Sequence, residues 1–398
     1  MRLRFRPFRW RTTVEIICAL LFALSLYQNF VTHISTSAVH IYYHYENYTS
    51  QRSMDIHLAM ILRGRKTVLR MQTLMKSIMY YQGRMDERTN ECQYNSYVPR
   101  LCTTRRPPRH RPIHLHIIGD EETRNLTDQI FRDWHLDDFH WTSYSLEKYL
   151  PTFSLMPNFH RAGRVTMVKL LIPYILPISI PKAIVIDSDT LLNENIADLW
   201  DYFDRFNATQ VFGCAWEQDS SDPECNTSSP GPITSYGVNS GVMLMNLFKM
   251  RQVDWDSIWR EASKQHLRYT LVFTRGEQDI LNTVINLHPQ LYYKIPCEWH
   301  VQLYSTVAGS CCPVVWPERK SDEVDCITKS GSTGTYQRPN MAYLVHCDTK
   351  WKPEDYEETD IPSLGLAQIS HSLTTDQLRK RFYEVYHQFK RLPEQCFH

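Results

Sequence analysis

The chain has 398 residues, of which 42% are hydrophobic, and this is enough apolar side-chain surface for one large α/β domain with additions. Its formal net charge of +1 at pH 7 argues against a nucleic-acid-binding protein, so no nucleic-acid partner is expected. Of the eleven cysteines, all but Cys18 lie beyond the first apolar run. The remaining even number suits disulfides in an oxidising compartment, with the pairing left open.

Residues 1–13 hold five arginines and precede an apolar run over 14–31, which is about as short as a bilayer span can be, roughly 17 residues. Arginines before the run predict a cytosolic tail, a transmembrane signal anchor and a lumenal body. A cleaved signal peptide is the alternative. Residues 32–54 are polar and aromatic and are expected to form a stem. Four sequons, which predict a glycoprotein, support the lumenal body: Asn47, Asn125, Asn207 and Asn226.

Strands and helices alternate after the stem. Strands are predicted at 56–62, 113–120 and 183–186, and helices at 65–81, 121–134 and 164–176. The charged segment 84–112, which holds Cys92 and Cys102, is expected to be an inserted loop closed by a disulfide. The alternation predicts an α/β fold with a mostly parallel, doubly wound sheet.

The second half of the chain continues the pattern. Strands are predicted at 209–216, 241–247, 291–295 and 341–346, and helices at 253–266, 276–287 and 374–390. Thr374 or Thr375 is the expected N-cap of the last helix. Since there is no internal repeat or low-complexity block, residues 55–398 are predicted to form one catalytic-size domain.

The strand at 183–186 ends in Asp187-Ser188-Asp189. An isolated Asp-x-Asp is most often a solvated turn or a helix cap. In an open parallel sheet, however, ligands bind outside the carboxyl ends of the strands. Residues i and i+2 of an extended segment project to the same side, so both carboxylates can approach one ion. Carboxylates suit Mg²⁺ or Mn²⁺ bound to phosphate oxygens, and the sequence therefore predicts such a site here.

Four motifs follow one another in the chain: "IVIDSDT", "GVNSGVMLMNL", "GEQDILN" and "YLVHCDTKWKP". In this order and spacing they resemble the retaining glycosyltransferases of family 8, over roughly residues 55–392. "IPCEWHVQL" and "ENIADLW" are most similar to the xylosyltransferase domain of the bifunctional xylosyl- and glucuronyltransferases, whose second domain is not expected here. The resemblance implies a GT-A fold, which is a Rossmann-like, nucleotide-sugar-binding fold with a mostly parallel twisted sheet flanked by helices.

The same resemblance implies roles for individual residues. Asp187, Asp189 and His346 would bind Mn²⁺ or Mg²⁺. Lys352 would neutralise the departing diphosphate, while Gln278 and Glu277 would lie at the reacting sugar. The residues implied in binding the UDP-sugar donor are Ile61, Leu62, Gly64, Lys169, Asp187, Ser188, Asn239, Gly241, His346 and Lys352. Three residues depart from the family pattern, Thr349 for Gly, Glu277 for Asp and His300 for Asn, and the last two leave the identity of the sugar open.

The expected function is that of a Golgi, Mn²⁺-dependent, retaining glycosyltransferase that transfers xylose from UDP-xylose to a glycan or glycoprotein acceptor with α linkage. One alternative keeps the fold and uses UDP-glucose or UDP-galactose. Another, from a different class, is a catalytically weak glycan-binding paralogue. The sequence gives no indication of an oligomeric state.

Overall fold

The structure is a computed structural model, and it describes residues 55–86, 88–92, 109–218, 237–304, 311–316, 328–329, 336–337, 340–355 and 374–398. The predicted tail, signal anchor and stem lie outside these residues, as do the sequons at Asn47 and Asn226. Within the described part, no helix is long and apolar enough to cross a membrane. The membrane topology therefore stays a prediction from the sequence.

A seven-stranded sheet forms the centre of the molecule, in the order β3-β2-β1-β4-β7-β6-β8. Its strands are β1 (Ile56–Leu62), β2 (Ile113–Gly119), β3 (Phe139–Ser145), β4 (Ala183–Ile186), β6 (Phe212–Trp216), β7 (Val238–Met245) and β8 (Tyr292–Lys294). Four of its six neighbouring pairs are parallel, and within this sheet β7 alone runs against both neighbours. The predicted mostly parallel α/β sheet is confirmed.

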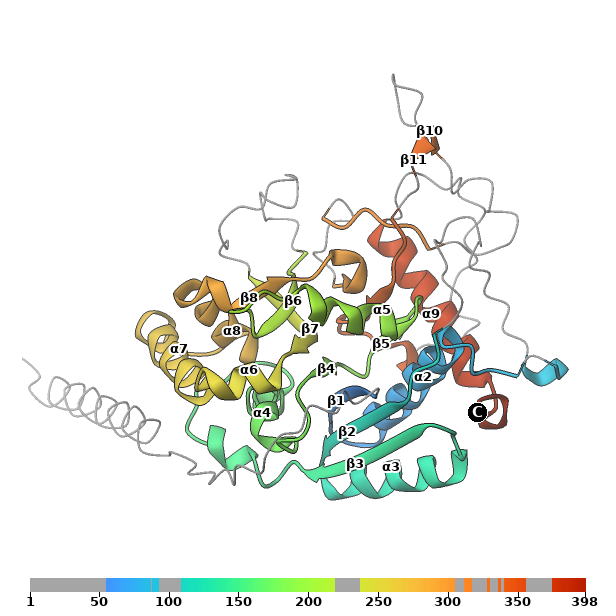
Figure 1. Ribbon diagram of the computed structural model, residues 1–398, viewed down its shortest axis with the longest axis horizontal. Coiled ribbons are helices and arrows are strands. Elements are labelled where there is room, and N and C mark those ends of the chain that lie inside the picture. The colour runs from blue at the N-terminus through green and yellow to red at the C-terminus, as the bar shows by residue number, and fades with distance from the viewer. Residues whose placement is uncertain are drawn as a thin grey trace, which may run out of the picture.

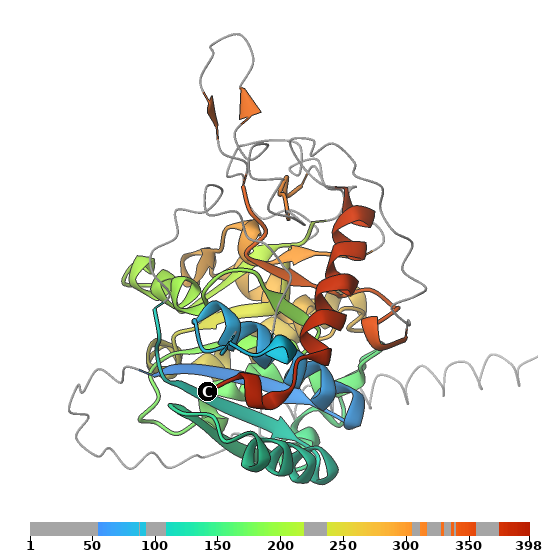
Figure 2. The same cartoon turned by 90° about the vertical axis from the view of Figure 1, so that its right-hand side faces the viewer.

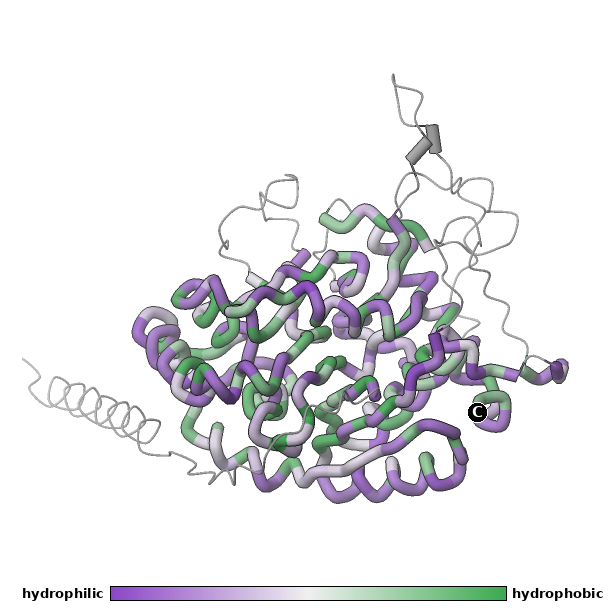
Figure 3. The backbone as a smooth tube through the Cα atoms, viewed as in Figure 1, coloured by the Kyte–Doolittle hydropathy of each residue, from purple (hydrophilic) through white to green (hydrophobic). Residues whose placement is uncertain are grey.

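Helices cover both faces of this sheet (Figures 1 and 2). One buried apolar cluster joins β1 to α2 (Arg65–Tyr81), α3 (Glu121–Trp134) and α9 (Thr375–Arg391). A second joins the sheet to α4 (Ile172–Ile175), α6 (Leu247–Gln252), α7 (Trp255–Thr270) and α8 (Glu277–Leu287). Alternate residues of β1 enter the two clusters, Leu58 the first and Ala59 the second. The central strands are accordingly hydrophobic, while the outlying α3 and α7 are largely hydrophilic (Figure 3).

Two helices follow the sequence prediction closely. The helix predicted at 65–81 is confirmed as α2, and its apolar residues at helical spacing are fully buried: Val68, Met71, Leu74, Met75, Ile78 and Met79. The helix α9 begins after Thr374, whose side chain accepts a hydrogen bond from the backbone of Gln377, while the Gln377 side chain bonds back to the Thr374 backbone. This capping box satisfies two amide groups that the first helical turn leaves without partners.

The predicted helix 164–176 is wrong as a single element. A 3₁₀ helix spans Gly163–Leu171, and α4 follows as a separate short helix. Pro173 explains the break, because proline is tolerated in the first turn of a helix but removes a hydrogen bond and clashes in a helix interior. The strand predicted at 241–247 also differs, since β7 begins at Val238 and already contains Asn239. The strand predicted at 209–216 begins later, at Phe212.

A smaller sheet joins three short strands, β5 (Thr190–Leu192), β12 (Leu344–His346) and β9 (Val301–Gln302). β12 lies between the other two, antiparallel to β5 and parallel to β9. Two further elements drawn in Figure 1 lie outside these two sheets. They are the short helix α5 (Ile196–Trp200) and the antiparallel ribbon of β10 (Thr328–Lys329) and β11 (Tyr336–Gln337).

Disulfides cross-link distant parts of the fold, as the cysteine count predicts. Cys92 pairs with Cys396, and Cys297 pairs with Cys312. Cys92 therefore does not close the predicted inserted loop on itself, because it is joined to Cys396 near the end of the chain instead. Two cysteines, Cys214 and Cys347, are free and buried.

We predict that the Cys92–Cys396 bridge stabilises the fold more than the Cys297–Cys312 bridge. They close loops of 304 and 15 residues, and the loss of chain entropy on cross-linking corresponds to about 5–6 and about 3 kcal/mol respectively. Urea unfolding of the two Cys→Ser double variants should show the larger decrease in unfolding free energy for Cys92→Ser/Cys396→Ser. An equal or smaller decrease would contradict the assignment of the long bridge as the main cross-link.

Candidate functional site

The candidate site lies where β4 ends. Asp187-Ser188-Asp189 leaves the carboxyl end of β4 and leads directly into β5. β5 pairs with β12, in a register that places Thr190 opposite His346. The backbone N–H of Cys347 donates to the carbonyl of Asp189 at 2.8 Å, which fixes the end of the pairing. Two motifs far apart in the sequence are thus joined by backbone hydrogen bonds.

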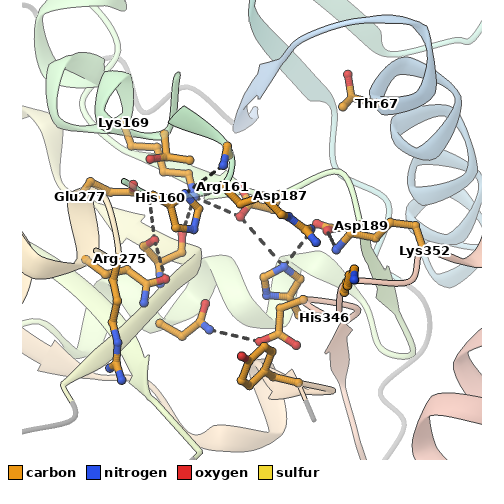
Figure 4. A pocket seen from close by; sticks show the side chains of 18 of the residues that line it. Thr67, His160, Arg161, Lys169, Asp187, Asp189, Arg275, Glu277, His346 and Lys352 are labelled. Atoms are coloured by element: carbon orange, nitrogen blue, oxygen red, sulfur yellow. Dashed lines mark hydrogen bonds and ion pairs between the residues drawn. The ribbon is translucent and has the colours of Figure 1, made fainter. Parts of the chain in front are cut away.

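This pairing brings the three predicted metal ligands together. Nε2 of His346 lies 3.3 Å from Oδ1 of Asp189 and 4.0 Å from Oδ2 of Asp187. One donor atom from each of the three residues lies within 4.8 Å of the other two. Figure 4 shows the imidazole facing the two carboxylates across the pocket. Two hard oxygen ligands and one imidazole nitrogen form a donor set that suits a divalent ion such as Mn²⁺.

The opposite side of the His346 ring is held by two neighbours. Its Nδ1 lies 3.0 Å from Nε2 of His300, which is fully buried. Gly241 faces the ring so closely that a Cβ atom there would lie 2.2 Å from Cε1 of His346. Glycine is therefore required at 241 by the position of the ring. His300, which departs from the family's Asn, contacts the back of His346, the predicted metal ligand.

Two lysines, the buried Lys169 and the partly buried Lys352, pair with the two aspartates. Nζ of Lys169 lies 2.9 Å from Oδ1 of Asp187, and Nζ of Lys352 lies 2.6 Å from Oδ2 of Asp189. Arg70 of α2 adds a third positive group 3.8 Å from Asp189, although its closer partner is Glu354 at 2.9 Å. The site thus holds cationic groups beside its carboxylates, which is the arrangement needed to bind a phosphate group.

Gln278 and Glu277 begin α8 on the other side of the pocket. Glu277 accepts a hydrogen bond from the Ser240 hydroxyl at 2.7 Å and lies 3.3 Å from Nζ of Lys169. Gln278 has its Oε1 3.3 Å from the same hydroxyl. The preceding Gly276 has φ +64°, and a Cβ there would also lie 2.6 Å from the Thr166 hydroxyl, so this start of α8 requires glycine.

These groups line a cavity of about 730 Å³. Of the predicted residues, those on its wall are Lys169, Asp187, Asp189, Asn239, Glu277, Gln278, His346 and Lys352. The predicted Ile61, Leu62, Gly64, Ser188 and Gly241 are not among the described residues that line it. Gly64 lies one contact away, since its carbonyl accepts from the hydroxyl of Thr67, which does line the cavity.

The family model of "Glycosyl transferase family 8" matches residues 22–353. The chain belongs to glycosyltransferase family 8. It is 30% identical over 259 residues to xylosyl- and glucuronyltransferase LARGE2 of Rattus norvegicus, which covers 64% of this chain and 34% of that protein. It is 27% identical over 264 residues to human LARGE1, covering 66% and 31%. The chain therefore spans about a third of the length of these relatives.

Among solved structures, the crystal structure of mouse xyloside xylosyltransferase 1 in its apo form matches with a TM-score of 0.50 and 20% identity. The match covers 74% of this chain and 98% of the mouse chain. At this level of identity the likeness concerns the fold, and the fold is the GT-A type predicted from the motifs. The Asp-x-Asp of this family 8 chain accordingly lies at the carboxyl edge of the sheet.

Two further carboxylates at or beside the site were given no role by the sequence, although Asp348 lies within the fourth motif. Glu217 follows β6 directly, and its Oε2 accepts from the Gln278 amide at 3.3 Å. Asp348 lies two residues after His346 and accepts from the Asn239 amide at 3.4 Å. One signal was present for Glu217, since it is an acid at the carboxyl end of a strand, like Asp187. Arg70 and Tyr304, which also line the cavity, carry no comparable sequence signal.

The charges in the site depend on burial and on pairing. Burial raises the pKa of Asp187, even though Lys169 acts in the opposite direction. Burial also opposes ionisation of Asp189, but the charges of Lys352 and His346 outweigh it and hold the pKa of Asp189 well below its usual range. Burial would lower the pKa of His346, yet Asp189 raises it. Asp189 is thus the firmly anionic member of the predicted ligand set.

Glu217 and Glu277 respond to burial in opposite ways. Burial, with a contribution from the nearby Asp348, raises the pKa of Glu217 to about 7. At Glu277 burial acts in the same direction, but the Lys169 charge and hydrogen bonds from Thr166 and Ser240 outweigh it and lower the pKa. Around neutral pH, Glu217 therefore exchanges its proton, while Glu277 stays ionised.

We predict that Glu217→Gln stabilises the metal-free protein above pH 7. Because the folded pKa of Glu217 lies above its ordinary 4.5, the folded state binds the extra proton and stability falls as the pH rises from about 4.5 to about 7. Glutamine resembles the protonated carboxyl, so urea unfolding in chelator at pH 8 should give a free energy higher by about 1–3 kcal/mol, with little difference at pH 4.5.

Glu277→Gln is the matched control for that measurement. It removes a carboxylate that is ionised in the folded protein and leaves Lys169 without one of its two acidic partners, so this variant should lose stability at pH 8. If both variants followed the wild-type pH dependence, the assignment of a proton to Glu217 would be wrong.

Proposed function

We propose that the chain is a Mn²⁺-dependent, retaining glycosyltransferase that moves xylose from UDP-xylose to a glycan or glycoprotein acceptor with α linkage. The observation that carries the proposal is the convergence of Asp187, Asp189 and His346 at the carboxyl edge of β4, beside two lysines and in a cavity lined mostly by polar residues. Membership of family 8 supports the reaction class. The preference for xylose is supported by the names of LARGE2 and of mouse xyloside xylosyltransferase 1.

The residues present fit a divalent ion. Their donor atoms converge, the oxygen and nitrogen ligands match Mn²⁺, and the absence of a side chain at Gly241 leaves the space that His346 occupies. When bound, such an ion supplies positive charge to diphosphate oxygens. His346 would present Nε2 to the ion while Nδ1 stays paired with His300, as ligating histidines commonly do.

The lysines would serve the leaving group. Lys169 and Lys352 hold positive charge on the two aspartates that face the cavity, and burial in a low-dielectric site strengthens their electric field. As the bond to the sugar breaks, negative charge grows on the diphosphate. Positive groups fixed in advance stabilise that charge without reorganising, which is the main electrostatic contribution expected here.

The groups near Gln278 favour departure and attack on the same face of the sugar. A double displacement needs a carboxylate beneath the anomeric carbon, whereas Gln278 is a neutral amide and a poor nucleophile. Glu277 is engaged by Lys169 and Ser240. In the proposed mechanism Gln278 supports positive charge on the sugar, while Glu217 accepts a hydrogen bond from the Gln278 amide and so orients it.

The proposed location is the Golgi membrane, with a single-pass anchor and the catalytic domain in the lumen. The arginines before residues 14–31 and the sequons support it. The two sequon asparagines within the described residues, Asn125 and Asn207, are both exposed, as glycosylation requires.

A panel of UDP-sugars tests the proposed function. With Mn²⁺, the protein should hydrolyse or transfer UDP-xylose faster than UDP-glucose or UDP-galactose, and chelator should stop the reaction. Asp189→Asn keeps the side-chain shape but removes the anionic ligand, so turnover should fall by more than about 100-fold. Asp376→Asn, on the first turn of α9, is the matched control and should leave turnover unchanged.

A preference for a hexose donor would replace xylose as the proposed donor sugar and leave the proposed enzyme class unchanged. If wild type turned over every UDP-sugar no faster than Asp189→Asn, the proposed enzyme activity would be wrong. The alternative of a glycan-binding protein would then remain.

We also predict that Gln278→Ala lowers turnover by roughly 100-fold without abolishing it, since it removes one group that stabilises developing charge. Glu277→Gln should mainly weaken donor binding. Intact-mass analysis with donor and no acceptor should show no sugar adduct on wild type. A stable pentose adduct mapped to Glu277 or Glu217 would overturn the same-face mechanism.

A further inference from the structure

A second group of metal-ligating side chains lies away from the donor site. His57 of β1 lies opposite His114 of β2 in the parallel register, and His116 follows two residues later on the same face of β2. Other residues of β1 and β2 on this face are apolar, such as Ala59 and Ile118. His57 and His116 are nevertheless buried, 6% and 0% exposed. Polar imidazole rings in such an apolar environment need partners for their ring nitrogens.

The ring nitrogens lie close together. Nδ1 of His57 lies 3.1 Å from Nε2 of His116. Two nitrogens bound to one tetrahedral Zn²⁺ at about 2.0–2.1 Å would be about 3.3–3.4 Å apart, so this pair already has a suitable spacing. One nitrogen from each of the three histidines lies within 4.8 Å of the other two. His114 is the least buried of the three.

Hydroxyl groups on the next strand hold the outer nitrogens of two of these rings. Nδ1 of His116 lies 3.1 Å from the hydroxyl of Tyr144, and Nε2 of His114 lies 2.8 Å from that of Thr142. Both partners belong to β3, which lies beside β2 (Figure 2). Metal-ligating histidines characteristically hold their second nitrogen in this way, because it fixes the tautomer and the ring orientation. For His114 this leaves Nδ1 as the nitrogen for an ion.

We propose that His57, His114 and His116 form a second metal site, for Zn²⁺ or a similar imidazole-preferring ion, that cross-links β1 and β2 independently of the donor site. Three imidazoles without a carboxylate among them select Zn²⁺ over Mn²⁺, which prefers oxygen ligands. The site is formed on the amino-terminal half of these strands, whereas the donor site is at the carboxyl edge of the sheet. Its ion would be structural rather than catalytic.

Zinc titration of the full chain tests the proposal. Metal-free Asp189→Asn protein, in which the donor site is impaired, should bind one Zn²⁺ per chain in competition with a chromophoric chelator, and excess Mn²⁺ should not displace it. Co²⁺ should give the intense visible absorption of a tetrahedral complex. Adding His114→Gln or His57→Gln should lower the Zn²⁺ affinity at least tenfold and remove the Co²⁺ band.

His140→Gln is the matched control. His140 lies opposite His114 on β3 but is exposed and outside the group of three, so its loss should leave Zn²⁺ binding unchanged. Binding that depends on His140 and not on His57 would reveal a surface pair and overturn the proposal. Binding unaffected by His57→Gln and His114→Gln would leave only a hydrogen-bonded chain of imidazoles, and the proposal would be wrong in that case too.

Two further measurements keep the test independent of folding and of catalysis. His114 is only half-buried, so His114→Gln should fold, and Zn²⁺ should raise the thermal midpoint of Asp189→Asn but not of Asp189→Asn/His114→Gln. In an otherwise wild-type chain, His114→Gln should keep full Mn²⁺-dependent turnover of UDP-sugar. Loss of that turnover in the folded variant would show that the two sites are not separate, against the proposal.

Discussion

The pairing of β5 with β12 is the interaction on which the candidate active site depends. Asp189 immediately precedes β5, and His346 ends β12 opposite Thr190. A slip of one residue in this register would turn the His346 side chain to the other face of the small sheet and away from the aspartates. Backbone hydrogen bonds therefore fix the donor atoms before any ligand binds, and the site is preorganised at the level of the main chain.

The antiparallel strand β7 supplies the second constraint. Its Gly241 accepts a hydrogen bond from the Asp187 backbone at 2.9 Å and leaves the space into which the His346 ring fits. Behind that ring, Nδ1 of the fully buried His300 has no hydrogen-bond partner among the described residues. The cost of burying that nitrogen is of the order of 1–3 kcal/mol. The buried His300 thus lowers the stability of the fold somewhat, while it holds the His346 ring in one orientation.

Charge is the third constraint, because the pocket buries acids and bases together. The single side chain of Lys169 pairs with two acids, Asp187 and Glu277. Removing water from such groups is unfavourable unless each retains a partner, and deleting one member leaves an uncompensated buried charge. The ion pairs allow the pocket to fold in its charged state, and they keep positive groups next to the place where a phosphate would bind.

The sequence by itself determined the elements and the chemistry of the main motif. The period of apolar residues predicted α2 and its buried face, and the run before Asp187 predicted the strand that delivers both carboxylates. Such local signals suffice because side-chain burial along one helix or strand follows its own repeat. They failed where a helix was continued through Pro173, and at Cys92, whose partner Cys396 is 304 residues away.

Only the tertiary structure decided which distant residues share a site. Glu217, which follows β6, meets Gln278 at the start of the helix α8. His300 meets His346, and His57 meets His116, because strands separated in the chain are neighbours in a sheet. No local pattern contains that information, since pairing between strands is set by packing of the whole core. The protonation of Glu217 likewise arises from burial and from Asp348, which a linear sequence does not place beside it. The sequence specified which chemical groups were available, and the fold set their distances and charges.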